Sequence, residues 1–196
     1  MKFIRASFAL ALALSLLTFG AVSADPAPNA PLQPSETKSF ADWTVRCYPV
    51  ASPSPCDMYE LLANKQTNQR VMSLSIAYMP AGDKHVIQIA VPLGVFIPAG
   101  LVIESNTYTS AVLPYRRCDR AGCYVEMIFD NGAVTSLSSA AGSAKIRIVA
   151  DGGKQFEIPF SLNGYNDAHG AMVDLARKKT AKPATPVTAA ATPPKP

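Results

Sequence analysis

The sequence lacks the short motifs that mark most families of enzymes. Its 196 residues contain no G-x-S-x-G elbow, no H-E-x-x-H helix, no G-x-G-x-x-G or Walker A loop and no EF-hand loop. Only two histidines, His85 and His169, offer a base near neutral pH. His85 opens a β-rich run and is interpreted as a structural side chain, and His169 as a surface residue. We therefore expect no catalytic residues, no cofactor and no enzymatic activity.

Charged residues are also scarce, at 16% of the chain, and their distribution argues against a nucleic-acid partner. The net charge of +4 arises at the ends, with Lys2 and Arg5 near the start and five cations but no acid from Arg177 onward. The body between them is therefore acidic. A face that binds nucleic acid carries Lys and Arg on the folded domain. Only three arginines cluster there, and we keep them as candidate interaction residues: Arg116, Arg117 and Arg120.

Long hydrophobic runs are absent except at the N-terminus. Lys2 and Arg5 precede an uncharged run over residues 6–22, and small residues at Val22-Ser23-Ala24 suit a signal peptidase. This pattern predicts a signal peptide over residues 1–24, cut after Ala24; a retained N-terminal anchor is the alternative, because the run is about long enough to span a bilayer. The mature chain is expected to have no transmembrane segment. We place it in the periplasm, at the cell surface or outside the cell.

Cysteine is limited to four residues, and an even number in an exported chain predicts two disulfides. Three pairings are open. The sequence favours the local one, which joins Cys47 to Cys56 and Cys118 to Cys123. A C-x-x-C redox motif is absent, and the C-x8-C and C-x4-C spacings do not fit a usual zinc site. We expect no metal site.

Proline is concentrated at the ends, where regular periodicity is missing. Residues 25–37 are interpreted as a Pro-rich leader, and residues 178–196 as a disordered tail of Lys, Ala, Thr and Pro. The tail is expected to be solvated, or alternatively to touch an anionic lipid or cell-wall surface. Residues 38–177 remain as one domain.

Within this domain the dominant hydrophobic period is two. Short alternating runs separated by Pro, Gly and Asp predict strands at residues 43–47, 71–79, 84–91, 108–115, 124–129, 146–150 and 156–162. Residues 117–123 predict a hairpin with a four-residue loop. Helices are expected at residues 131–141 and 166–179. The fold class is therefore mainly β, an antiparallel β-sandwich or barrel-like single domain with a short C-terminal helix. The candidate aromatic core residues are Trp43, Phe96, Phe129, Phe156 and Phe160.

Residues 91–101 form the most unusual segment, because they are apolar and punctuated by Pro and Gly. One interpretation is a buried, kinked crossover between strands. The other is an exposed hydrophobic loop that contacts a partner through Val95, Phe96 and Ile97.

Five segments, in this order, resemble the invasion-associated locus B family of exported alphaproteobacterial proteins: ADWTVRC (41–47), CDM (56–58), PLGVFIPAG (92–100), PYRRC (114–118) and GC (122–123). The resemblance runs from about residue 40 to residue 175. Ala41 departs from the glycine that the family often has, and Tyr59-Glu60 stands where glutamine commonly follows. The family is named for a role in erythrocyte entry by a pathogen, and it brings no catalytic residues.

The resemblance and the residues together predict a non-enzymatic envelope protein that binds a protein or cell-envelope partner. In a pathogen such a protein would assist host-cell attachment or invasion. Two alternatives stay open. One is a periplasmic chaperone-like or stress-response module, and the other is a small periplasmic hydrolase with a Ser-His-Asp site outside any motif.

Overall fold

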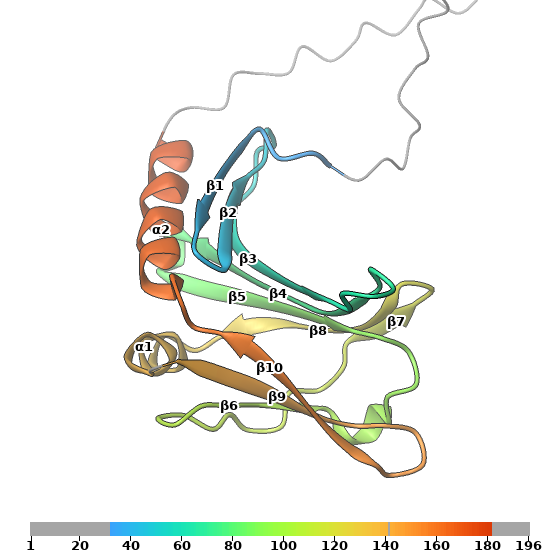
Figure 1. Cartoon of the computed structure of the whole chain (residues 1–196). Coiled ribbons are helices and arrows are strands. Elements are labelled where there is room, and N and C mark those ends of the chain that lie inside the picture. Colours follow the sequence, from blue (N-terminus) through green and yellow to red (C-terminus); the bar gives the residue numbers. More distant parts are fainter. Residues whose placement is uncertain (1–31, 141, 182–196) are drawn as a thin grey trace, which may run out of the picture. The chain divides into compact units, whose positions relative to one another are not determined.

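A computed structural model describes residues 32–140 and 142–181 (Figure 1). The predicted signal peptide, the leader up to residue 31 and the tail from residue 182 lie outside the described residues. The described part contains ten strands in two antiparallel sheets, with two α-helices and two 3-10 turns, η1 (Pro80–Gly82) and η2 (Ile97–Ala99). The predicted mainly β, antiparallel class with a C-terminal helix is confirmed.

The larger sheet has seven strands, and the smaller sheet has three. In spatial order the larger sheet consists of β1 (Glu36–Phe40), β2 (Trp43–Cys47), β3 (Cys56–Ala63), β4 (Arg70–Met79), β5 (Lys84–Val91), β8 (Gly122–Phe129) and β7 (Arg117–Asp119). The smaller sheet consists of β10 (Gln155–Ser161), β9 (Ser143–Val149) and β6 (Leu101–Glu104). In the described part both sheets keep two edge strands, so neither closes into a barrel.

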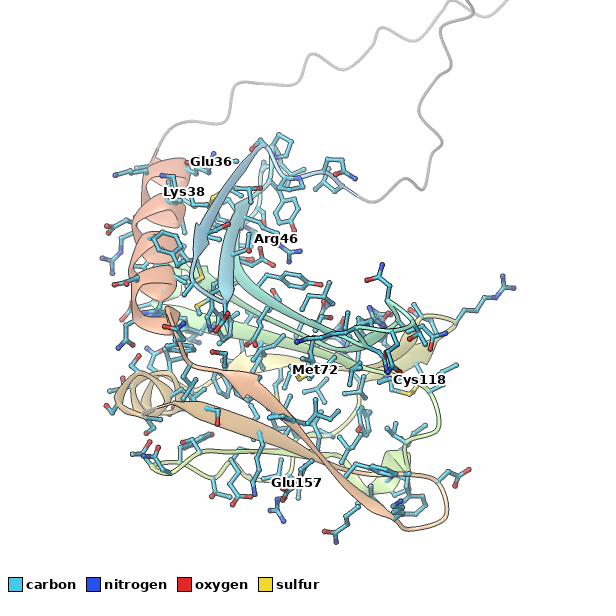
Figure 2. All side chains as sticks on the ribbon, viewed as in Figure 1. Glu36, Lys38, Arg46, Met72, Cys118 and Glu157 are labelled. Atoms are coloured by element: carbon cyan, nitrogen blue, oxygen red, sulfur yellow. A yellow bond between two sulfur atoms is a disulfide. The ribbon has the colours of Figure 1, made fainter. Side chains whose placement is uncertain are left out.

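Alternation within the strands decides which face is buried. In β4, Met72, Leu74, Ile76 and Tyr78 are buried, whereas Ser75 and Ala77 on the opposite face are only partly buried. Side chains from both sheets fill the space between them, with Met72 among them (Figure 2). The sheets therefore share one hydrophobic core.

Two α-helices pack against the strands and bury side chains in the shared core. α1 (Asn131–Ser139) begins after Asp130, whose carboxylate accepts a hydrogen bond from the Ala133 amide at 3.2 Å. α2 (Tyr165–Ala181) lies against β1 to β4 (Figure 1). Its buried face recurs at helical spacing through Tyr165, Ala168, Met172 and Ala176.

Both disulfides are local. Cys47 is bonded to Cys56 across β2 and β3, and Cys118 to Cys123 across β7 and β8. These are the pairs that the sequence favours. The second hairpin is tighter than predicted, because Asp119 pairs with Gly122 and leaves a two-residue turn in place of the four-residue loop.

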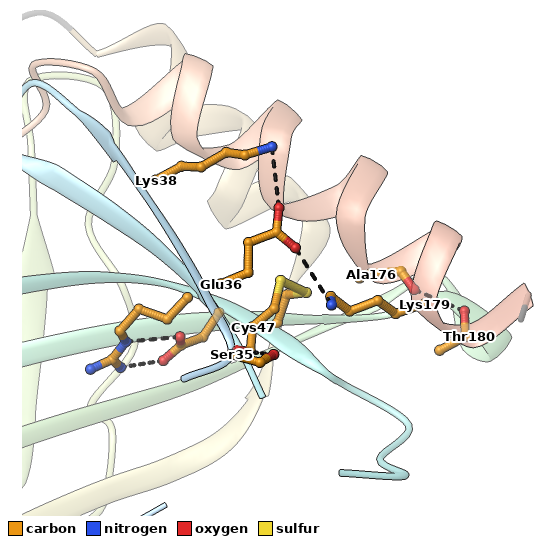
Figure 3. Close-up of a disulfide and its surroundings, with 10 residues drawn as sticks. Ser35, Glu36, Lys38, Cys47, Ala176, Lys179 and Thr180 are labelled. Carbon is orange, nitrogen blue, oxygen red and sulfur yellow. Dashed lines mark hydrogen bonds and ion pairs between the residues drawn. A yellow bond between two sulfur atoms is a disulfide. The ribbon is translucent and has the colours of Figure 1, made fainter. Parts of the chain in front are cut away.

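The first disulfide lies beside a junction of the two ends of the domain. Figure 3 shows Glu36 between Lys38, at 3.3 Å, and Lys179 of α2, at 3.5 Å. The lysines, chiefly Lys38 through its hydrogen bond, lower the pKa of Glu36. β1 begins at Glu36, two residues before the predicted domain start at residue 38, and α2 ends at Ala181, four residues after the predicted end at residue 177.

Two further sequence predictions are wrong. Residues 108–115 form no strand and make only isolated bridges to the preceding strand β6, Glu104 with Thr109 and Leu101 with Leu113. Trp43, Phe129 and Phe160 are buried, but Phe96 and Phe156 are 45% and 41% exposed. Phe156 shares the face of the buried Ile158 and Phe160 but lies near the exposed start of edge strand β10, with the Lys154 ammonium 4.9 Å from its ring centre.

Candidate binding surfaces

The segment after β5 presents apolar side chains to solvent. Leu93, Phe96 and Ile97 are 58%, 45% and 53% exposed, and Val112 of the neighbouring segment is 59% exposed. We call these four residues the apolar loop. Val95, the third residue predicted to take part in binding, is only partly exposed and packs against the core. The expectation of a buried crossover is therefore wrong for Phe96 and Ile97.

The backbone of the apolar loop is held in place although its side chains are exposed. The Phe96 amide donates to the Val149 carbonyl at 2.8 Å, and Val95 forms a bridge with Ala150 of the following turn. At the far end Gly100 has φ +59°, and a Cβ there would lie 2.6 Å from the Leu113 carbonyl oxygen. Exposed side chains on a fixed backbone bind with a small loss of conformational entropy.

The three candidate arginines lie on the hairpin of β7 and β8. Arg117 contacts Asp119 at 2.6 Å and Glu126 at 3.0 Å, and its guanidinium lies 3.9 Å from the ring centre of Tyr124. The hydrogen bond to Glu126 is the main reason why the pKa of Arg117 is raised. Arg116 is 3.9 Å from the same Glu126, and Arg120 occupies the turn. These acids offset much of the positive charge, which weakens the hairpin as a site for an anionic polymer.

The structure places this hairpin and the apolar loop at the same end of the larger sheet. Val91, the last residue of β5, pairs with Cys123 of β8. The chain enters the apolar loop directly after Val91. The predicted interaction residues thus come from two neighbouring segments rather than from unrelated parts of the surface.

The two histidines form a contact that the sequence did not reveal. Nε2 of His85 in β5 lies 2.9 Å from Nε2 of His169 in α2, and Nδ1 of His85 lies 2.7 Å from Oδ1 of Asn131. His85 is buried, as expected of a structural residue. His169 is half-buried, so the prediction of a surface residue is wrong. Its burial, followed by the proximity of His85, lowers the pKa of His169 to about 4.

The neighbouring acids Asp57 and Glu60 point to opposite faces of β3 and form no catalytic pair. Asp57 accepts two hydrogen bonds from Arg46 and one from Ser75 at 2.7 Å. Glu60 faces the core side and is 8% exposed. Its burial is the main reason why its pKa is raised to about 7. An acid at an inward position of an alternating strand was the signal in the sequence, and sequence reasoning passed over it.

A family model for "Invasion associated locus B (IalB) protein" matches residues 43–173 of the chain. The chain belongs to this family. The resemblance seen in the sequence is thereby confirmed, and the matched region includes both disulfides, the apolar loop and the two histidines.

Known proteins named after invasion protein B are similar to this chain at low identity. Invasion protein B homologs of Brucella abortus, from strain 2308 and from biovar 1 strain 9-941, are each 24% identical over 131 residues. The aligned part covers 67% of this chain and 75% of each relative. The crystal structure of invasion associated protein B from Bartonella henselae matches with a TM-score of 0.62 at 23% identity. The structural match covers 73% of this chain and 99% of the Bartonella chain, so the two proteins share the fold.

Two features are absent from the described residues. Neither α1 nor α2 is long and apolar enough to cross a membrane, and no group of three or more His, Cys, Asp or Glu side chains in this part of the chain is placed to hold a metal ion.

Proposed function

We propose that this protein is an exported, non-enzymatic binding module of the bacterial envelope. The observation that carries the proposal is the apolar loop, which exposes Leu93, Phe96 and Ile97 on a hydrogen-bonded backbone. Exposed apolar side chains that gather at one place are typical of sites that contact another macromolecule. The arginine-bearing hairpin at the same end of the sheet supplies polar contacts at the rim of this surface.

The environment of the histidines supports a role without catalysis. Both ring nitrogens of His85 are engaged, by Asn131 and by His169. A base that activates a nucleophile needs a ring nitrogen within reach of that nucleophile. Here the ring nitrogens of His85 bind other structural groups instead, which argues for a non-enzymatic protein over the hydrolase.

Export is supported by the two disulfides, which form and persist in oxidising compartments such as the periplasm. The basic and apolar N-terminal residues fit the same route. The names of the Brucella and Bartonella proteins refer to invasion. In a pathogen, the partner of the apolar loop would accordingly lie on the host cell, and the module would assist attachment or entry.

The test is a photo-cross-linking amino acid in place of Phe96, in living cells with and without host cells. Ile128, which is 54% exposed on β8, is the matched control position. We expect one discrete adduct from position 96 that depends on the partner cell and disappears in the Ile97→Asp background. Equal adduct patterns from both positions would contradict the proposal. Protease digestion of intact cells, with a periplasmic marker as control, decides between surface and periplasm.

A chaperone-like periplasmic module is the second candidate, because the same exposed apolar side chains would also suit unfolded chains. The two differ in selectivity. A chaperone would suppress the aggregation of several unrelated denatured proteins, and the double variant Phe96→Asp/Ile97→Asp would lose this activity. A binding module would leave such aggregation unchanged.

A further inference from the structure

A cleft of about 460 Å³ opens between the two sheets, away from the residues of the apolar loop. One wall comes from β3 and the other from edge strand β10. The turn between β1 and β2 and the start of β9 complete it. The lining residues are Asp42, Glu60, Leu61, Leu62, Ser143, Pro159, Phe160 and Ser161.

Ser161 is the centre of the polar contacts in this cleft. Its amide donates to Oε1 of Glu60 at 2.9 Å, and its hydroxyl donates to Asp42 at 2.6 Å. Its carbonyl accepts the indole N–H of Trp43 at 3.0 Å. These bonds leave one buried polar group of the cleft without a partner.

That group is Oε2 of Glu60, which has no hydrogen-bond partner among the described residues. Glu60 as a whole is 8% exposed, so the surroundings of its carboxylate are poor in water. A buried acceptor without a donor is costly, and a carboxylate more so. An occupant of the cleft that donates hydrogen bonds and carries positive charge would relieve this cost.

The other lining residues indicate which kind of ligand the cleft could bind. Asp42 adds a second carboxylate, and among the described residues no Lys or Arg lines the cleft to neutralise the pair. Leu61, which is 52% exposed, lies with Leu62 and Phe160 along the walls and offers apolar surface. A cationic head beside the acids and an aliphatic stem along the leucines would match these walls.

We propose that this cleft binds a primary ammonium or guanidinium group carried on a short aliphatic chain, with Glu60 and Asp42 holding the cation and Leu61 packing against the stem. A free amine and a lysine or arginine side chain of a polypeptide present the same chemistry. The site is distinct from the apolar loop, so it does not depend on the function proposed above. Burial, together with the charge of Asp42, raises the pKa of Glu60 to about 7, and binding is therefore tighter at pH 8 than at pH 5.5.

The experiment titrates the folded protein with n-butylammonium, with n-butylguanidinium and with a blocked tripeptide that contains one lysine. The readout is nuclear magnetic resonance, because Trp43 is the single tryptophan and its indole N–H is bonded to Ser161. n-Butanol is the uncharged control ligand. We expect the Trp43 indole and Ser161 amide signals to shift with the cations and not with butanol. Binding of the amine alone identifies a small-molecule site, and tighter binding of the peptide identifies a polypeptide partner.

Variants separate the cleft from general charge effects. Glu60→Gln keeps an acceptor for the Ser161 amide and removes the charge, and we expect at least tenfold weaker binding. Leu61→Arg blocks the cleft without touching Ser161 and should abolish binding. Asp174→Asn, an exposed acid on α2, removes the same charge elsewhere and should bind as the wild type does. Equal shifts with butanol, no shift with any cation, or equal loss in Asp174→Asn would overturn the proposal.

Discussion

The Nε2 atoms of His85 and His169 lie 2.9 Å apart and join the central sheet to the C-terminal helix. The amide of Asn131 fixes the direction of this bond. Its Nδ2 donates to the Asp83 carbonyl at 2.8 Å, so its Oδ1 faces Nδ1 of His85 and accepts a hydrogen bond from Nδ1–H. In this arrangement Nε2 of His85 carries no hydrogen, and it accepts a hydrogen bond from Nε2–H of His169.

This contact predicts a loss of stability in acid. The pKa of His169 falls from 6.5 to about 4 on folding, so the unfolded state binds more protons between these pH values. The free energy of unfolding should therefore decrease as the pH falls from 6.5 to 4, by about 1–2 kcal/mol after allowance for the partial exposure of the ring. Urea titrations at pH 7 and pH 4.5 measure this decrease. His169→Gln keeps a donor for His85 and should remove the histidine contribution; an unchanged difference in that variant would show that His169 is not its source.

Glu60 predicts the opposite dependence on pH. Its pKa rises from 4.5 to about 7 on folding, so the folded state holds the proton more tightly. The stabilising contribution is complete below pH 4.5 and is lost as the pH rises through 7, by about 2–3 kcal/mol at most. Glu60→Gln should therefore be more stable than the wild type at pH 8 and close to it at pH 4.5. Chemical denaturation at the two pH values checks this, and a variant that is less stable at pH 8 would contradict it.

The two disulfides should differ in their contribution to stability. Cys47 and Cys56 are buried in the core, whereas Cys118 is exposed at the end of the sheet (Figure 2). The loops that they close have similar lengths, with sequence separations of 9 and 5, so the chain-entropy contributions are similar. We expect the Cys47→Ala/Cys56→Ala variant to lose about 3–4 kcal/mol and the Cys118→Ala/Cys123→Ala variant about 2 kcal/mol. Thermal unfolding of both variants gives the comparison, and equal losses would mean that burial adds nothing.

Gly164 is expected to be irreplaceable at the start of α2. It has φ +81°, and a Cβ there would collide with the carbonyl group of Phe40. Gly152 is the matched control, because it has φ +93° but open space around the same position. Gly152→Ala should cost about 1 kcal/mol of backbone strain, whereas Gly164→Ala should cost more than about 3 kcal/mol because strain and collision add. Circular dichroism melts measure both, and similar losses would show that the approach of Phe40 is unimportant.

Two aromatic residues provide a test of the surface role of the apolar loop. Phe96 is 45% exposed and Phe160 is 3% exposed. Phe160→Ala should destabilise the protein by about 3–5 kcal/mol, because it leaves a cavity in the core. Phe96→Ser should change stability by less than about 1 kcal/mol. If Phe96→Ser unfolds the protein, the side chain belongs to the core and the apolar loop is not a free surface.

Local pattern in the sequence was enough for much of the fold. Alternation of apolar residues predicted β2, β4, β5 and β8, and helical spacing predicted α2. The spacing of the four cysteines favoured the two disulfides that the structure contains. These features depend on neighbours in the chain, and period and turn chemistry report on them directly. The strand predicted at residues 108–115 was wrong because it too was inferred from local alternation alone. The alternation is real, but these residues make only single bridges with β6.

The sequence by itself thus determined much of the strand pattern and the family, and it favoured the cysteine pairs that the structure contains. Only the tertiary structure decided which hydrophobic residues stay exposed and which polar residues meet. His85 and His169 are 84 residues apart, and Glu60 and Ser161 are 101 residues apart. Contacts over such separations arise when strands and helices pack, and no local period encodes them. The exposure of Phe96 and the burial of Glu60 follow from the same cause, because the packing of the two sheets determines the solvent exposure of each side chain.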